Sequence, residues 1–208
     1  MMQDSDLQII RKIQQGEVNN FREIVDSYKY KAFSLVSKII KNREEAEDTL
    51  QDAFLKLFRA IVDKQFEEKS RFSTYLYSVV YNTAVDHYRK YYNKKFNITS
   101  IDINESAYHE GDELTRNFNE YKAFQVNERK AEEREVKTIV KKYLNSIPEH
   151  YSVILNMFFI NELSHDEISN ILKLPIGTIK NRIFRAKEKL KEILLRAYKE
   201  EELLEYIV

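Results

Sequence analysis

The sequence contains no cysteine and no tryptophan, and it has only three glycines and two prolines among 208 residues. Without cysteine there are no disulfides, no thiolate zinc sites and no cysteine nucleophiles, which fits a reducing compartment. Glycine and proline together make up roughly 12% of an average protein, and β-rich folds need them for tight turns. Their scarcity therefore argues against a sandwich, a barrel or a propeller. The glycine-rich loops that cradle phosphates are also absent from the sequence.

Long apolar runs are missing as well. No run reaches the roughly 18 residues of a membrane span, and residues 1–11 are polar with charges of both signs, unlike a signal peptide. We therefore expect a cytoplasmic protein without membrane insertion. Charged residues make up 33% of the chain and hydrophobic residues 43%, a mixture that suits amphipathic helices with one solvated face.

The chain has no net charge, because 34 lysines and arginines balance 34 aspartates and glutamates. The charges are nevertheless separated along the sequence. Residues 173–196 hold eight basic and two acidic side chains, whereas residues 101–135 hold ten acidic and five basic ones. Residues 42–52 hold five acidic side chains and one arginine. Segments of opposite charge indicate that different parts of the chain contact different partners.

Apolar residues recur every three or four positions in the first part of the chain, which predicts amphipathic helices. We expect these helices over residues 7–13, 21–39, 46–61 and 73–91. Gly16 follows the first helix, and two pairs resemble the N-terminal caps of the next two, namely Asn20 with Glu23 and Asn42 with Glu45. Residues 1–95 are therefore predicted to form one helical domain.

The pattern changes at residues 96–135, which are acidic, rich in Asn and Glu, and without a clear apolar period, so we expect a flexible linker. Periodicity returns at residue 136, and Pro148 opens a helix with apolar residues as far as Phe159. Ser164 and Glu167 fit a capping box, and Pro175 begins one more helix. The prediction is an all-α protein of two small helical domains, 1–95 and 136–208, joined by an acidic flexible linker. Residues 197–208 extend beyond the last pattern.

Residues 164–191 have the pattern of a helix-turn-helix, whose second helix lies in the major groove of DNA. Ser169 is small enough for the crossing of its two helices. With Ile176, Ile179 and Ile183 facing inward, side chains that donate to base edges face outward. These are Thr178, Lys180, Asn181, Arg182 and Arg185, followed by lysines placed to contact phosphates, Lys187, Lys189 and Lys191. The alternative is a basic, solvated helix of an ordinary bundle.

Aromatic and basic side chains alternate between residues 66 and 92. Aromatic faces stack on unpaired bases, and cations follow the nucleic-acid backbone. The side chains that suit this task include Phe66, Phe72, Tyr75, Lys69, Arg71, Arg89 and Lys90. The alternative for each aromatic residue is a place in the hydrophobic core.

The acidic segment 44–52 has three interpretations: a solvated face, a protein-docking face or a carboxylate metal site. Asp48 and Asp52 are four residues apart and share one helix face. A metal site like those of helical magnesium-dependent nucleotide hydrolases needs a second carboxylate pair, such as Glu132 and Glu135. The four histidines have no ligand spacing, and His165 is explained by the capping turn. We therefore expect no cofactor, no metal and no catalytic residues.

Five segments carry a family resemblance: EEAEDTLQDAFLKLF at 44–58, RFSTYLY at 71–77, NTAVDHYRK at 82–90, LNSIPE at 144–149 and GTIKNRIFRA at 177–186. In this order they resemble the bacterial RNA polymerase sigma factors of the extracytoplasmic-function (ECF) type. That family has two helical domains, called regions 2 and 4, joined by a linker. The resemblance implies a non-enzymatic initiation factor that binds core RNA polymerase, recognises the −35 and −10 promoter elements and assists strand opening.

The resemblance also implies roles for single residues. Docking on the clamp coiled coil of the largest polymerase subunit is implied for Asp48, Gln51, Asp52 and Phe54. Contacts with the −10 element, including capture of a flipped base, are implied for Phe66, Lys69, Ser70, Arg71, Tyr75, Asn82, Arg89 and Lys90. The helix that contains Lys180 to Arg185 is expected to read the −35 duplex, with the flap of the second-largest subunit as a further partner.

Three further expectations follow. The acidic linker is expected to imitate nucleic acid in a basic channel of the polymerase, and the net charge of zero predicts weak binding to free promoter DNA. An anti-sigma factor is a candidate partner, because many relatives are held inactive in that way. Two alternatives to a sigma factor are kept: a helix-turn-helix regulator that needs no polymerase, and a metal-dependent nucleotide hydrolase.

Overall fold

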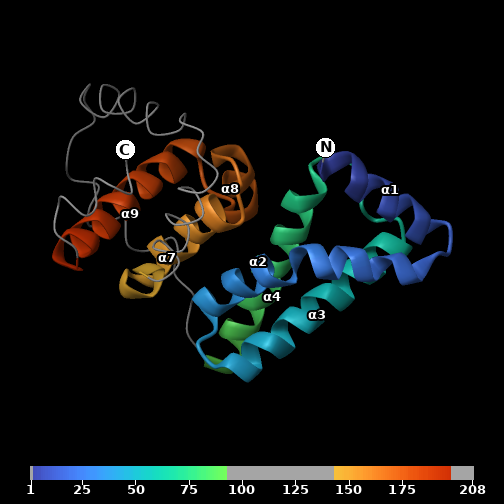
Figure 1. The fold of residues 1–208 in the computed structure, drawn as a ribbon, viewed down its shortest axis with the longest axis horizontal. Coiled ribbons are helices and arrows are strands. Elements are labelled where there is room, and N and C mark those ends of the chain that lie inside the picture. Colours follow the sequence, from blue (N-terminus) through green and yellow to red (C-terminus); the bar gives the residue numbers. More distant parts are fainter. Residues whose placement is uncertain (1, 93–142, 198–208) are drawn as a thin grey trace.

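The computed structural model describes residues 2–92 and 143–197, and every regular element in these two ranges is a helix, which confirms the predicted all-α class. Figure 1 shows two groups of helices beside each other. The first group contains α1 (Met2–Gln14), the short turn η1 (Val18–Asn20), α2 (Phe21–Ile39), α3 (Arg43–Val62) and α4 (Phe72–Tyr92). The second contains η3 (Leu144–Ser146), α7 (Glu149–Leu155), η4 (Asn156–Ile160), α8 (His165–Leu172) and α9 (Ile176–Ala197).

Of the two N-terminal caps predicted in the first group, the structure contains one and lacks the other. The Asn42 side chain accepts a hydrogen bond from the backbone N–H of Glu45 at 3.2 Å and caps α3 as predicted. The cap predicted at Asn20 is wrong, because this residue has helical backbone angles and belongs to the turn η1. Its amide instead donates to the carbonyl oxygen of Glu17 at 2.9 Å. Gly16, with φ +102°, adopts the left-handed conformation after α1 that glycine tolerates best.

The core of the first group is built from edge-to-face aromatic pairs. Phe21 of α2 meets Phe58 of α3 with ring centroids 5.1 Å apart. Tyr28 of α2 meets Phe72 of α4 at 6.0 Å, and its hydroxyl donates to Asp6 of α1 at 2.6 Å. Such pairs add about 0.5–1.5 kcal/mol to the burial of their area. The aromatic residues thus connect all four long helices of the group.

The helix-turn-helix forms where it was predicted. The Ser164 side chain accepts from the N–H of Glu167, and Glu167 accepts from the N–H of Ser164, so the predicted capping box is confirmed. Lys173 ends α8 in the left-handed conformation, with φ 56°. The Ser169 hydroxyl donates to the carbonyl oxygen of Leu174 at 2.5 Å, which fixes the turn before α9.

The helix expected from Pro148 to Phe159 is not uniform. The α-helix α7 ends at Leu155, and the chain continues as one π-helical turn, η4. The amide of Asn156, the first residue of this turn, donates to the hydroxyl of Ser34 on α2 at 2.7 Å. The amide of Asn161, just beyond it, donates to the carbonyl oxygen of Lys31 at 2.9 Å. Both ends of the widened turn are therefore held by α2.

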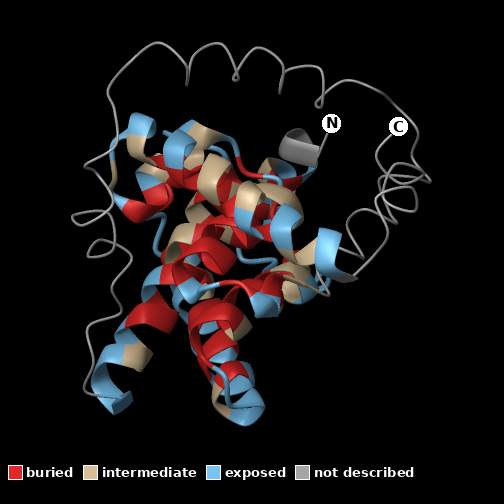
Figure 2. Cartoon of the chain, turned by 90° about the vertical axis from the view of Figure 1, so that its left-hand side faces the viewer, coloured by how far each residue is buried: buried red, intermediate tan, exposed pale blue. Residues whose placement is uncertain are grey.

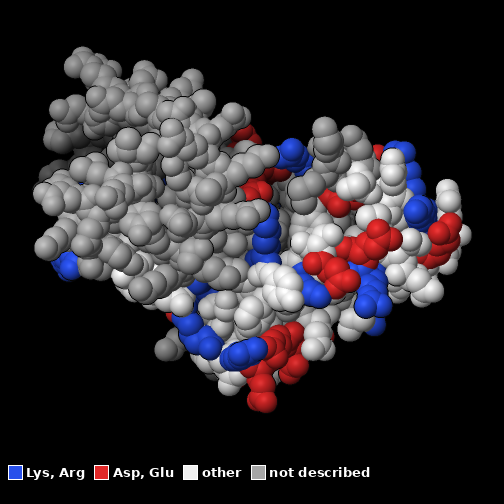
Figure 3. All heavy atoms as spheres, in the orientation of Figure 1, with Lys and Arg blue, Asp and Glu red and all other residues white. Residues whose placement is uncertain are grey.

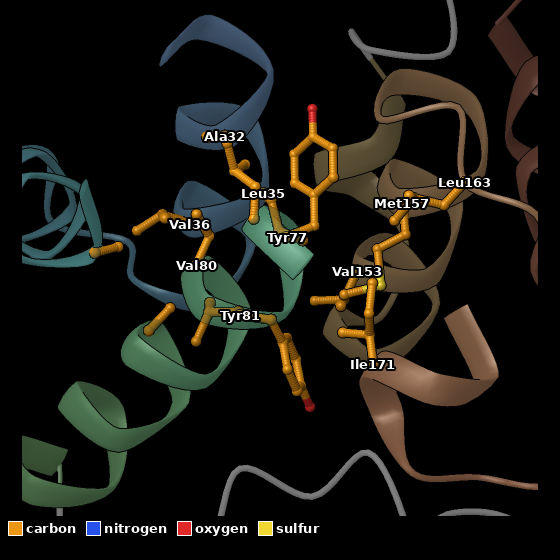
Figure 4. Close-up of a cluster of buried hydrophobic side chains, with 14 of the residues drawn as sticks. Ala32, Leu35, Val36, Tyr77, Val80, Tyr81, Val153, Met157, Leu163 and Ile171 are labelled. Carbon is orange, nitrogen blue, oxygen red and sulfur yellow. The ribbon is translucent and has the colours of Figure 1, made fainter. Parts of the chain in front are cut away.

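The two groups of helices share one continuous hydrophobic core. Figure 2 shows buried residues through the interior of both groups. Figure 4 shows the junction, with Leu35 of α2 and Tyr77 and Tyr81 of α4 on one side and Val153 and Met157 on the other. The predicted linker 96–135, the start of the second domain before residue 143, and the extension after Ala197 lie outside the described residues.

None of the helices in the described ranges is long and apolar enough to cross a membrane.

Candidate nucleic-acid interface

The first half of α3 presents an acidic face. Asp48, Gln51 and Asp52 are exposed, as the proposed docking role requires. Figure 3 shows acidic side chains gathered where α3 begins, at the bottom of the view. Glu45 is turned toward α4, where it accepts hydrogen bonds from the Tyr92 hydroxyl at 2.8 Å and from His87 Nε2 at 3.3 Å. These bonds, the first more than the second, hold the pKa of Glu45 below its usual range.

Phe54 does not lie on this acidic face. Its side chain is 8% exposed, and its ring packs 6.4 Å from that of Phe21 in the core. The neighbouring Leu55, for which the sequence predicted no role, is 53% exposed. Positions 48, 52 and 55 are four and three residues apart, so helical periodicity places Leu55 on the same face as Asp48 and Asp52.

The segment between α3 and α4 is divided between core and surface. Phe66 is 5% exposed and lies between Phe72 and Tyr75, with ring centroids 5.6 Å and 5.2 Å away, so the structure favours the alternative of a place in the core for this ring. Lys69, Ser70 and Arg71 are exposed, as expected. Burial of the apolar Phe66 ring against two other aromatic rings is favourable because it removes apolar surface from water. Phe66 thus anchors the segment whose polar residues face outward.

The predicted −10 residues on α4 lie at different depths. Tyr75 is half-buried, and burial raises the pKa of its hydroxyl. Asn82 is exposed, and its amide lies 3.4 Å from the hydroxyl of Ser78 one turn earlier. Arg89 and Lys90 are exposed in the last turns of the helix. Asn82 and Arg89 are seven residues apart, so they share one face of α4.

The helix α9 exposes only part of the predicted reading face. Lys180 and Asn181 are exposed, while Thr178 and Arg185 are half-buried. Arg182 is 3% exposed, which contradicts its predicted outward position, whereas Ile176, expected to face inward, is 37% exposed. The inward face is instead formed by the four buried residues Ile179, Ile183, Ala186 and Leu190.

Arg182 lies at the edge of that inward face, close to the junction with the first group of helices. Burial raises the pKa of Tyr81 on α4 to about 12, and the positive charges of Arg89 and Arg182 oppose this rise. The guanidinium group of Arg182 on α9 is therefore close enough to affect the titration of Tyr81 on α4. Sequence periodicity places Arg182 beside the buried positions of its own helix but does not predict that the charged side chain itself is buried.

The three lysines predicted to contact phosphates differ in their exposure to solvent. Lys189 and Lys191 are exposed, and Lys189 pairs with Glu192 at 3.4 Å. The ammonium group of Lys187 lies over the rings of Phe158 and Phe159, 4.9 Å and 5.4 Å from their centroids. Its burial there lowers the pKa of Lys187. Lys187 is held at the protein surface by these rings rather than extended toward solvent.

Glu167 joins the helix-turn-helix to α4. Its Oε1 accepts from the hydroxyl of Thr74 at 2.6 Å and lies 3.8 Å from the guanidinium of Arg71, while Oε2 accepts from the N–H of Ser164 at 2.8 Å. Burial acts to raise the pKa of Glu167, but the bonds from Thr74 and Ser164 and the charge of Arg71 outweigh it and lower the pKa. Nothing in the local sequence around Thr74 indicated this contact.

A metal site finds no support in the part of the chain that the structure describes, where no group of three or more His, Asp or Glu side chains is placed to hold an ion. The second carboxylate pair that such a site would need, Glu132 and Glu135, lies outside the described residues.

Comparison with known proteins accounts for both groups of helices. Residues 24–93 match the family model for sigma-70 region 2, and residues 137–190 match that for sigma-70 region 4. The ECF RNA polymerase sigma factor SigW of Bacillus subtilis is 32% identical over 89% of this chain and 94% of its own length. The chain belongs to the ECF family of RNA polymerase sigma factors. As a sigma factor it is a promoter-specific transcription initiation factor that works with core RNA polymerase and promoter DNA, and it is not an enzyme.

Two further relatives of this sigma factor support the assignment. RNA polymerase sigma-H factor of Pseudomonas aeruginosa is 27% identical over 93% of this chain and 96% of its own length. The ECF RNA polymerase sigma-E factor of Escherichia coli is 28% identical over 88% of this chain and 91% of its own length. Each of these similarities thus extends over nearly the whole length of both proteins.

Two solved structures share the fold of this sigma factor. CnrH in complex with the cytosolic domain of CnrY has a TM-score of 0.57 at 18% identity, covering 91% of this chain and 97% of that one. RpoE of Bartonella quintana, in complex with the anti-sigma factor NepR, has a TM-score of 0.55 at 18% identity, covering 84% of this chain and 96% of that one.

Proposed function

We propose that this sigma factor divides promoter recognition between its two helical domains while acting on the polymerase in the cytoplasm. Residues 1–95 dock on core polymerase and hold the opened −10 strand, and residues 136–208 read the −35 duplex. Residues 96–135 connect the domains. The observation that carries this division is that acidic α3 and basic α9 place exposed charges of opposite sign on different domains of one chain. Such an arrangement favours one protein partner and one nucleic-acid partner.

Docking on the clamp coiled coil is assigned to the exposed face of α3. Asp48, Gln51 and Asp52 supply polar contacts, and Leu55 takes the apolar role first given to Phe54. A leucine with half of its side chain in solvent gains when a partner covers it. We expect Leu55→Ala to weaken binding to core polymerase by about 1–2 kcal/mol.

The matched control for that variant is Tyr30→Ala. Tyr30 on α2 is 78% exposed, and the proposal gives it no role in docking. The affinity of each variant for core polymerase is measured by fluorescence anisotropy of the labelled sigma factor. An equal loss from both variants would argue against the assigned docking face.

Strand capture is assigned to the surface that leads into α4. Lys69, Ser70 and Arg71 are exposed there, and Tyr75 offers part of its ring beside them. Cations in this position follow a phosphate backbone, and the tyrosine stacks on an unpaired base, which is worth about 1–3 kcal/mol. Phe66 supports this surface from the core. Asn82, Arg89 and Lys90 extend the contact along α4.

Reading of the −35 duplex is assigned to α9. Lys180 and Asn181 are exposed in its second turn, and Thr178 and Arg185 flank them. Amide and guanidinium groups discriminate adenine and guanine in the major groove. Lys189 and Lys191 contribute phosphate contacts farther along the helix, where they add affinity without sequence preference. Arg182 is left out of this set because its side chain is 3% exposed.

Reconstitution with core polymerase on a promoter library tests the whole proposal. We expect sequence-specific transcripts that depend on the sigma factor, whose selected promoters share two separated elements. Transcripts without any shared sequence would overturn it. A specific shift of duplex promoter DNA by the isolated chain, with no effect of polymerase, would favour a polymerase-independent regulator instead.

A further inference from the structure

Two polar side chains at the start of α4, those of Arg71 and Thr74, contact Glu167 of the second domain. Thr74 is buried, and its hydroxyl donates to the Glu167 carboxylate at 2.6 Å. The exposed Arg71 approaches the same oxygen at 3.8 Å. These two residues lie on either side of Phe72 and next to Tyr75, at the surface to which the −10 strand is assigned. A short hydrogen bond to a carboxylate is stronger than one between neutral groups.

The contact is one of several that hold the two domains together. Asn156 and Asn161 donate to Ser34 and Lys31 on α2, and the Lys38 ammonium donates to the Asn145 side chain at 2.7 Å. Two salt bridges join α2 and the chain just after it to the second domain, Lys31 with Glu162 at 3.2 Å and Lys41 with Glu149 at 3.4 Å. Buried apolar side chains fill the space between these polar contacts. The closed arrangement is therefore a packed interface rather than a loose encounter of two domains.

This arrangement is incompatible with reading both promoter elements at once. Elements named −35 and −10 are about 25 base pairs apart, which is roughly 85 Å of B-form DNA. Two domains in side-chain contact cannot each lie on one of these elements.

We propose that Arg71 and Thr74 form a shared anion seat, which the carboxylate of Glu167 occupies in the closed sigma factor and a phosphate of the −10 strand occupies on the promoter. A carboxylate and a phosphate both accept from a guanidinium and a hydroxyl group. The helix-turn-helix domain thus competes with the −10 strand for the same site on the first domain. This inference rests on the proposed −10 role of the first domain and adds the means by which that role is blocked.

The seat gives the isolated chain a low apparent affinity for the opened strand. When only a fraction of molecules is open, the measured dissociation constant equals the intrinsic one divided by that fraction. Glu167→Gln keeps the size of the side chain and an oxygen that can accept from Ser164, but it removes the negative charge. Asp166→Asn removes the same charge from the same helical turn, at an exposed position for which the structure shows no hydrogen bond or ion pair. The pair of variants separates loss of the seat from a change in net charge.

The test uses the full chain and two measurements. The first is the affinity for a fluorescein-labelled single-stranded oligonucleotide, the non-template −10 strand of a promoter selected with polymerase. The second is the distance between spin labels at Tyr30→Cys and Asn170→Cys, two exposed positions on α2 and α8. The chain has no cysteine of its own, so these labels are unique.

We expect Glu167→Gln to bind the oligonucleotide about three to ten times more tightly than the parent and to lengthen the label distance. Asp166→Asn should leave the distance unchanged. Thr74→Val, which removes the hydroxyl from the opposite side of the seat, should lengthen the distance as well.

Three results would overturn the inference. Equal tightening by Glu167→Gln and Asp166→Asn would show that net charge alone is responsible. An unchanged distance in both Glu167→Gln and Thr74→Val would show that the seat does not hold the domains together. A longer distance without tighter DNA binding would show that the strand does not use the seat. Failure of the proposed function is recognised separately, by the absence of promoter-specific transcripts from the parent chain with polymerase.

Discussion

The two domains hold their helices in place by different means. In the first domain α3 and α4 are 20 and 21 residues long and pack through aromatic rings. In the second, α7 and α8 are seven and eight residues long, and α8 begins with a capping box and ends in a turn fixed by Ser169. Helices shorter than about 12 residues are marginal by themselves. The difference indicates that the first domain depends on its core and the second also on local hydrogen bonds.

The largest effect on stability is expected from the removal of an aromatic side chain from the core of the first domain. Phe72 is fully buried and contacts Tyr28 and Phe66. Replacement by alanine leaves a cavity, and we expect Phe72→Ala to reduce the free energy of unfolding by about 3–5 kcal/mol. Urea denaturation followed by circular dichroism measures this loss, with the exposed Tyr30→Ala as the control. A loss below 1 kcal/mol would mean that the core of the first domain is not specifically packed.

The next largest effect separates the domains by function. Arg185 of α9 is half-buried beside the exposed Asn181 and lies in the proposed reading face. We expect Arg185→Ala to weaken or change −35 preference by about 1–3 kcal/mol while −10 preference is kept. The measurement is promoter selection with polymerase, and Arg196→Ala, which removes the same charge from the end of α9, is the control. A parallel change at both elements would contradict the division between the domains.

A smaller effect is expected from the capping box. Ser164→Ala removes the acceptor for the N–H of Glu167 and should cost about 1 kcal/mol. In amide hydrogen exchange we expect faster exchange along all of α8, because the helix is short. Asn42→Ala removes the equivalent cap from α3 and should affect only its first turn. Uniformly faster exchange along α3 would remove the contrast between the domains.

The smallest effect is a pH dependence of the second domain. Burial against Phe158 lowers the pKa of His165, and the charges of Lys180 and Lys187 lower it further. The unfolded chain therefore binds a proton at this residue at higher pH than the folded chain does. Stability should fall as pH drops below about 6.5, the ordinary histidine value. Urea midpoints at pH 7.5 and 5.5 measure the loss, and His165→Gln should make it smaller. An unchanged pH slope in this variant would assign the titration to another group.

Local features were predictable from the sequence. The α-helices of the first domain, the cap at Asn42, the capping box of Ser164 and Glu167, and the helix after Pro175 all depend on residues within one or two turns of each other. Asn20 shows the limit even at this range. Its pairing with Glu23 has the spacing of a cap, but a preceding turn places its backbone in the helical conformation.

Burial was not predictable for residues whose neighbours lie far away in the chain. Phe54 is buried because Phe21 packs against it from α2, and Leu55 is exposed because nothing does. Arg182 is buried as well, and its charge acts on Tyr81 of α4, 101 positions earlier in the chain. The contact between Thr74 and Glu167 joins residues 93 positions apart, and neither side chain carries a periodic or charge pattern that marks the other.

Glu167 serves two structural purposes with one side chain, because it closes the start of α8 and also binds α4. The same substitution therefore acts on helix formation and on domain contact, and most replacements would change both together. A substitution of Glu167 that weakens the contact between the domains would therefore also destabilise α8, the first helix of the helix-turn-helix. Glutamine, which retains an acceptor for the cap, is the replacement that separates the two consequences.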